Sequence, residues 1–136
     1  MAAVEQLLRI EPSGNISFGN HSLEAKAKLE DFPYNGDLLK VKTFKTMTKL
    51  ERNGMFVYES VPGTSVFEFK ETAEGIEFRV SGSEDAQITI GLEEDTEYTV
   101  TVNGQNMGTM KTNMSGKLNV SVELADTDDV EVSIKK

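Results

Sequence analysis

The sequence predicts an all-β protein, an antiparallel β-sandwich, and three observations lead to that prediction. First, apolar and polar residues alternate along many short segments, which is typical of strands with one buried and one exposed face. Second, turn residues separate these segments at intervals of about 8–12 residues, as they do in sandwiches and barrels. Third, both signals occur together between Gly91 and Leu124, where the runs Tyr98 to Val102 and Leu118 to Leu124 flank the turn pairs Asn103-Gly104 and Ser115-Gly116. That segment is therefore expected to form strand, turn, short strand, turn, strand.

The first half of the chain has the same pattern with several irregular points. Leu23 to Leu29 alternates without a fault and predicts a half-exposed strand. Leu39 to Thr43 also alternates, but Phe44 then falls out of phase, which predicts a bulge or bend in one long strand. Asn53-Gly54 lies between two strand-like runs and predicts a tight hairpin with positive φ at both turn residues. Val4 to Ile10 fits either a short strand or one helical turn.

The remaining strands are more regular. With the segments above, they bring the expected total to about nine to twelve strands. They are expected at residues 66–70, 75–80, 88–92, 98–102, 107–111, 118–124 and 130–134.

The composition narrows the class of protein. With 136 residues, of which 38% are hydrophobic, the chain can bury one core or two small ones. It has no cysteine, which excludes disulfides, thiolate metal sites and thiol nucleophiles. The segment Met1 to Ile10 has neither a basic start nor a long apolar run, so we expect no secretory signal, no membrane span and a cytoplasmic location.

Nearly all the excess negative charge lies in the second half. The formal net charge is −9, and residues 1–72 hold nine Lys/Arg against ten Asp/Glu, whereas residues 73–136 hold five against thirteen. A chain this acidic repels nucleic-acid phosphates, so we expect no nucleic-acid partner. The polar link Glu71 to Glu74 predicts a boundary between an N-terminal β domain or half, residues 1–72, and a second unit, residues 73–136. Two small sandwiches in tandem and one sandwich with an extended first half both fit the sequence.

The run Leu92 to Val102 resembles the fibronectin type III and wider immunoglobulin-like pattern of a leucine, a tight corner, and then threonine and tyrosine leading a strand. In that family the tyrosine hydroxyl bonds back to the backbone a few residues upstream, and Tyr98 stands at the matching position. The run Val102 to Val120 is similar to small β-sandwich modules appended to bacterial polysaccharide-acting enzymes. The resemblance implies an immunoglobulin-like second half, residues 73–136.

Over its full length the chain is also similar to small bacterial proteins that carry the automatic name endosialidase. A sialidase needs a much longer propeller that presents an arginine cluster and a tyrosine nucleophile, whereas the arginines here are Arg9, Arg52 and Arg79. We therefore expect the name to be a mislabel that implies no sialidase activity.

Several polar residues are candidates for catalysis, and a simpler role fits each of them better. His21 is the only histidine, and it is expected to be an exposed loop residue because catalysis needs partners that the nearby sequence lacks. Glu51 and Glu59 straddle a hairpin and would be the minimum pair for glycoside hydrolysis. We expect them instead to be surface charges paired with Lys49 or Arg52. The sequence thus predicts no catalytic residue.

Two acidic turns are candidates for calcium binding. Glu93 to Asp95 and the cluster Asp126, Asp128 and Asp129 offer carboxylate oxygens at an end of the sandwich. The second cluster lacks the glycine and the later bidentate glutamate of an EF-hand loop, so a solvated acidic turn is favoured. We predict no metal and no cofactor, and calcium at Asp126, Asp128 and Asp129 stays an open alternative.

Two groups of side chains are candidates for contacts with a partner. The basic stretch between Lys40 and Arg52 is expected to be the solvent face of a sheet, with pairing to the acidic second half, within or between molecules, as a further use. Met107, Met110 and Met114 cluster around one turn and are a candidate adaptable contact surface. The aromatic residues expected in the core are Phe56, Tyr58, Phe67, Phe69 and Phe78.

These observations favour a non-catalytic structural or interaction protein that self-associates. The charge asymmetry, the many strands and the missing catalytic constellation lead to this hypothesis. A carbohydrate-binding accessory module is the alternative, and a glycan-acting enzyme is a disfavoured third. The expected partner is a second copy or another protein, with a glycan as the alternative, and neither nucleic acid nor membrane.

Overall fold

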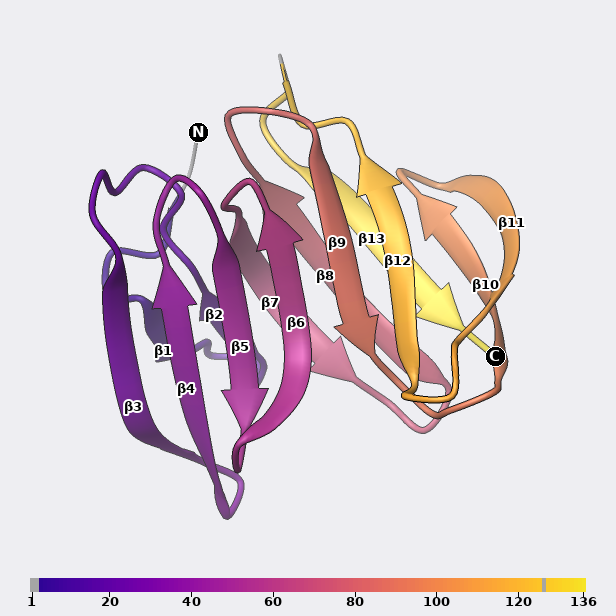
Figure 1. Ribbon diagram of the computed structural model, residues 1–136, viewed down its shortest axis with the longest axis horizontal. Helices are drawn as coiled ribbons and strands as arrows, with labels where there is room; N and C mark the ends of the chain where they lie inside the picture. The colour runs from indigo at the N-terminus through magenta and orange to yellow at the C-terminus, as the bar shows by residue number, and fades with distance from the viewer. Residues whose placement is uncertain (1–2, 126) are drawn as a thin grey trace.

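The computed structural model describes residues 3–125 and 127–136, and the secondary structure of this part of the chain is entirely antiparallel β (Figure 1). Its thirteen strands form two sheets, which confirms the predicted all-β sandwich. The strand count exceeds the predicted range, in part because the three-residue strand Ile16–Phe18 has too short an alternation to be recognised. Within the described residues, there is no helix of the length and hydrophobicity needed to cross a bilayer.

The two sheets differ by one strand, and we call them sheet A and sheet B. In Figure 1 sheet B lies in front. The strands of the N-terminal half lie on the left of the picture, and those of the C-terminal half lie on the right. Sheet A has the order β1 (Leu8–Ile10), β2 (Ile16–Phe18), β7 (Ser65–Glu71), β8 (Gly75–Ser81), β13 (Val130–Lys135), β10 (Glu97–Val102) and β11 (Gln105–Lys111). Sheet B has the order β12 (Lys117–Val122), β9 (Ala86–Gly91), β6 (Met55–Val61), β5 (Thr48–Arg52), β4 (Asp37–Thr43) and β3 (Ala27–Tyr34).

Both sheets run across the expected boundary at residue 72. In sheet A, β7 pairs with β8, and in sheet B, β6 pairs with β9. The buried apolar residues form one cluster that extends from Leu8 to Ile134. Each segment, 1–72 and 73–136, thus contributes strands to both sheets, and their division into two units stays a prediction.

An aromatic cluster lies at the centre of the core. Phe18 and Tyr58 are fully buried, and their ring centroids lie 5.2 Å apart in an edge-to-face arrangement. Phe69 packs 5.5 Å from Phe18 and Phe78 packs 5.8 Å from Tyr58. Edge-to-face pairs of this kind add to the stabilisation from burial alone. The prediction of a core position is therefore confirmed for Tyr58, Phe69 and Phe78.

Phe56 and Phe67 were predicted in the core, and this prediction is wrong. Both are half-buried, because Phe56 pairs with Glu51 on the outer face of sheet B and Phe67 pairs with Arg79 on the outer face of sheet A. A shift in register accompanies each position, next to Glu51 on β5 and after Phe67 on β7. Such bulges change which face a residue occupies, and alternation alone does not reveal them.

The hairpin turns match the sequence closely. Asn53 and Gly54 have φ values of 51° and 79°, and Asn103 and Gly104 have 50° and 78°. Two consecutive positive φ values suit the right-handed twist of the strands that such turns join. The predicted tight hairpin at Asn53-Gly54 is confirmed.

Two predicted strands have different bounds in the structure. The strand predicted from Leu23 begins only at Ala27 and continues to Tyr34. The long strand expected to bend at Phe44 is instead two strands, because β4 ends at Thr43 and the Phe44 N–H donates to the Met47 carbonyl at 2.9 Å. The out-of-phase residue therefore marks a turn and not a bulge.

Tyr98 closes the corner before β10. Its side chain is 2% exposed, and its hydroxyl oxygen accepts a hydrogen bond from the Glu93 N–H at 3.3 Å. Thr112 braces the same corner, because its hydroxyl donates to the Glu93 carbonyl at 2.6 Å. The backbone contact expected of Tyr98 is therefore present, and it gives this residue a structural role.

Candidate functional site

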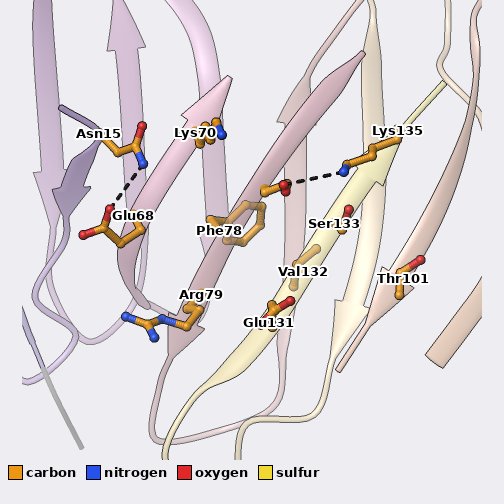
Figure 2. A pocket seen from close by; sticks show the side chains of 11 residues that line it. Asn15, Glu68, Lys70, Phe78, Arg79, Thr101, Glu131, Val132, Ser133 and Lys135 are labelled. Atoms are coloured by element: carbon orange, nitrogen blue, oxygen red, sulfur yellow. Dashed lines mark hydrogen bonds and ion pairs between the residues drawn. The ribbon is translucent and has the colours of Figure 1, made fainter. Parts of the chain in front are cut away.

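A concave surface that carries polar side chains lies on the outer face of sheet A, and we call it the trough. It has a volume of about 800 Å³ and spans strands β7, β8, β13 and β10. Figure 2 shows its polar side chains lying on the same face of these strands. The residues that line it are Asn15, Glu68, Lys70, Glu77, Phe78, Arg79, Thr101, Glu131, Val132, Ser133 and Lys135.

Glu68 forms one rim of the trough and is held by three polar residues near β2. Its backbone has a φ of 54°, at the point where the register between β7 and β8 shifts. Its carboxylate accepts hydrogen bonds from the Ser13 hydroxyl at 2.5 Å and from the Asn15 side-chain amide at 3.2 Å (Figure 2). Its N–H donates to the Ser17 hydroxyl at 3.1 Å. This rim is therefore preorganised, whereas the floor of the trough has fewer contacts.

His21 is buried, which corrects the prediction of an exposed loop histidine. It is 6% exposed, and its Nδ1 lies 2.8 Å from the hydroxyl oxygen of Ser65, which is fully buried. Ser65 lies on β7 and is separated from His21 by 44 residues in the sequence. The sequence alone therefore does not reveal that the two side chains are in contact. The Ser65 hydroxyl is enclosed, whereas His21 lines a recess of about 300 Å³ together with Lys45 and Glu84.

The His21 pair lies beside a buried polar cluster at one end of the sandwich. Thr48 is its centre, since its hydroxyl lies 2.8 Å from that of Thr43 and donates to the Thr64 carbonyl at 2.7 Å. The Thr64 hydroxyl in turn lies 2.7 Å from the hydroxyls of Tyr58 and Ser60. Burial raises the pKa of Tyr58 above its ordinary value. The cluster is satisfied internally, so it orders the core end and leaves no free reactive group among these residues.

We expect the stability of the protein to fall as the pH drops below the ordinary His pKa of 6.5. Burial lowers the pKa of His21, so between the two values the unfolded state binds more protons than the folded state. Stability from the neutral imidazole is thus fully present above pH 6.5 and is lost below it. Urea unfolding at about pH 7.5 and about pH 5.5 measures this loss in the wild type and in His21→Gln. The loss is expected to be smaller in His21→Gln, and equal losses would contradict the assignment to His21.

Glu51 and Glu59 lie on neighbouring strands on the outer face of sheet B. Glu51 stands directly opposite Lys40 on β4, and Glu59 stands directly opposite Lys49 on β5. Both residues are half-buried. The structure thus places each of them across from a lysine on the face of a sheet.

Arg52 belongs to the predicted basic stretch, but its side chain binds acidic residues at the end of the sandwich. Its guanidinium donates two hydrogen bonds to the Glu71 carboxylate and lies 3.6 Å from an oxygen of Asp37. The hydrogen bonds that Arg52 donates to Glu71 raise the pKa of Arg52. Three of the predicted lysines, Lys40, Lys42 and Lys49, remain on the outer face of sheet B.

In the described residues of the two acidic turns, Glu93 and Asp129 form ion pairs. Lys136 Nζ lies 2.9 Å from a Glu93 oxygen, and Arg79 Nε lies 3.8 Å from an Asp129 oxygen. Asp126 lies outside the described residues, so the predicted cluster with Asp128 is not placed as a whole. Over residues 3–125 and 127–136, no group of three or more His, Cys, Asp or Glu side chains is arranged to hold a metal ion.

The three methionines differ in exposure and in the element that carries them. Met107 and Met110 lie on β11, whereas Met114 lies in the turn before β12. Met107 is 49% exposed and lines a recess of about 280 Å³ with Val102 and Val122, while Met114 is 80% exposed. A common contact surface of Met107, Met110 and Met114 stays a prediction.

Comparison of the chain with models of protein families, with curated proteins and with solved structures finds no match.

Proposed function

We propose that this protein is a non-catalytic interaction module that self-associates through β11. The supporting observation is that β11, the last strand of sheet A, has six of its seven residues exposed. A strand with one neighbour and solvent on both faces buries little apolar surface by itself. A second copy of the chain would cover this strand and supply the missing burial.

The edge strands on the opposite side of the two sheets, β3 and β1, have features that hinder such contacts. At the far end of sheet B, β3 contains Pro33, and its register with β4 shifts between Leu29 and Phe32. At the far end of sheet A, β1 has three residues. Proline, bulges and short edge strands all hinder strand-to-strand association. The side formed by β11 and β12 is therefore the better surface for a partner.

The bulge in β11 directs Met107 toward this surface. Val100 pairs with Gly108 and Thr101 pairs with Asn106, so Met107 is the extra residue. It lines the recess between the β10–β11 hairpin and β12. Methionine is a flexible side chain that adapts to a partner surface. In a symmetric pair, each copy would place its β11 against the recess of the other.

Charge also favours a second copy at this position. Lys111 is the only charged residue of β11, although the chain as a whole has a net charge of −9. Two copies with the same negative charge repel each other least where neither carries acidic side chains. The segment 105–111 has none, and Glu123 is the one acidic residue among those that line the recess.

Sedimentation equilibrium over a range of concentrations tests this proposal. We expect the average mass to rise toward twice the chain mass, and the substitution Met107→Glu to weaken association by at least about tenfold. Met55→Glu is the matched control, since Met55 is 72% exposed at the tip of the β5–β6 hairpin. The control should change the dissociation constant by less than about twofold. A wild-type chain that stays monomeric at high concentration, or equal effects of the two substitutions, would refute the proposal.

We also propose that residues 73–136 are immunoglobulin-like and that the protein acts in the cytoplasm. The corner formed by Tyr98 and the Glu93 N–H supports the first part, because it has the geometry that the sequence pattern implies. The absence of cysteine supports the second part.

A further inference from the structure

The floor of the trough consists of two rows of side chains that run across the strands. In the first row, Thr101 on β10 lies opposite Ser133 on β13, Ser133 lies opposite Glu77 on β8, and Glu77 lies opposite Lys70 on β7. A second row continues from Glu131 on β13 to Arg79 on β8 and to the half-buried Phe67 on β7. Figure 2 shows Glu131 and Arg79 side by side on this face. Side chains in such rows are close neighbours, so a ligand that crosses the strands meets them in order.

Several of these polar groups have no partner in the part of the molecule that the structure describes. Among the described residues, the hydroxyls of Thr101 and Ser133, the ammonium of Lys70 and the carboxylate of Glu131 form no hydrogen bond or ion pair. Lys135 Nζ and a Glu77 oxygen lie 3.6 Å apart, which is beyond hydrogen-bond distance (Figure 2). The trough therefore offers free donors and free acceptors together.

The charges in the trough cancel, although the whole chain is acidic. Three carboxylates line it, those of Glu68, Glu77 and Glu131, and the basic side chains that line it are equally numerous. A surface with equal numbers of both signs has no net attraction for a polyanion or a polycation. The charge pattern therefore favours a neutral ligand. The basic side chains are Lys70, Arg79 and Lys135.

The position of the trough within sheet A excludes strand pairing as the mode of binding. Each of β7, β8, β13 and β10 has a strand on both sides, so its backbone groups bond within the sheet. A peptide laid on this face would keep its own N–H and carbonyl groups without backbone partners. Sugar hydroxyls both donate and accept, and side chains of the kinds found in the trough can satisfy them.

We propose that the trough is a binding site for a neutral oligosaccharide that lies across β10, β13, β8 and β7. Three steps between neighbouring strands, each about 4.8 Å, give a path of about 14 Å from Thr101 to Lys70. Hydroxyls of the sugar bind the Thr101 and Ser133 hydroxyls, donate to Glu131 and accept from Lys70 and Arg79. This proposal is independent of self-association, because the trough is formed within one copy of the chain.

Amide chemical-shift mapping by NMR on the full chain tests the proposal. The probes are hexasaccharides of β-1,4-glucan, β-1,4-xylan, β-1,4-mannan and α-1,4-glucan, with an oligogalacturonate as the anionic comparison and an uncharged extended peptide as the peptide comparison. We expect at least one neutral hexasaccharide to shift amides of β7, β8, β13 and β10, and not those of sheet B. If none does so up to the solubility limit, or if only the anionic sugar or the peptide shifts these amides, the proposal is wrong.

A matched pair of double variants distinguishes specific contacts in the trough from non-specific binding of the oligosaccharide. Thr101→Val with Ser133→Ala removes the two floor hydroxyls and is expected to weaken binding about tenfold, as two lost hydrogen bonds would. Thr89→Val with Ser121→Ala makes the same chemical change on the outer face of sheet B, on β9 and β12. This control is expected to leave the affinity unchanged. Equal losses in both double variants would overturn the assignment of the trough.

Discussion

Replacing Phe18 with alanine is expected to lower the free energy of unfolding by about 3–5 kcal/mol. Phe18 is fully buried, and its ring packs against Tyr58 at 5.2 Å and against Phe69 at 5.5 Å between centroids. The substitution removes the buried ring and leaves a cavity between two rigid sheets, which cannot close around it. Both edge-to-face contacts are lost as well. Urea unfolding measures the change as a shift in the midpoint at constant m-value.

Phe56→Ala is the control for this prediction. Phe56 is also a strand phenylalanine, but it is half-buried on the outer face of sheet B, with the Lys117 ammonium 4.6 Å from its ring centroid. We expect a loss of about 1 kcal/mol, from partial burial and the cation–π contact. A loss as large as that of Phe18→Ala would contradict the placement of the core between the sheets.

The second large effect is expected for Gly116→Ala, which should destabilise the protein by about 3 kcal/mol. Gly116 has a φ of 78°, a left-handed conformation that is unfavourable for alanine. An added Cβ would lie 2.4 Å from the Leu92 carbonyl oxygen, so the backbone must move as well. That movement would strain the hydrogen bond from the Leu92 N–H to the Gly116 carbonyl, now 2.7 Å long.

Gly104→Ala separates the two contributions. Gly104 has the same φ of 78°, but no atom lies within 4 Å of the position of an added Cβ. We expect a loss of about 1 kcal/mol, which is the cost of the left-handed conformation alone. The difference between the two variants, measured by urea unfolding, gives the cost of the close approach to Leu92. If the two losses are equal, the close approach has no energetic consequence.

The alternation of apolar residues was sufficient to predict the class of fold. The runs in β10 and β12 have the buried and exposed residues where the pattern expects them, since Tyr98, Val100, Leu118 and Val120 are all buried. The turn pairs were also reliable, because positive φ at an Asn-Gly pair is a local property of those residues. Local chemistry therefore predicts the strands and their turns.

Features that depend on contacts between distant segments could not be predicted. Neither the order of the strands nor the trough can be read from the sequence, because the trough combines residues of β7, β8, β13 and β10. His21 was misplaced for the same reason, since its burial depends on Ser65, which is 44 residues away. Phe67 was misplaced because a bulge follows it, and bulges shift register without a clear signal.

Two strand pairs, β6 with β9 and β7 with β8, join the segment 1–72 to the segment 73–136. These two pairs determine how the segments would behave if they were separated. Severing the chain between residues 72 and 73 and pulling the segments apart would uncover four strand edges, those of β6, β7, β8 and β9. Each uncovered edge is a template that the edge of the complementary segment fits in register. The two segments are thus complementary fragments, and exchange between two molecules would rebuild the same sheets from halves of different chains.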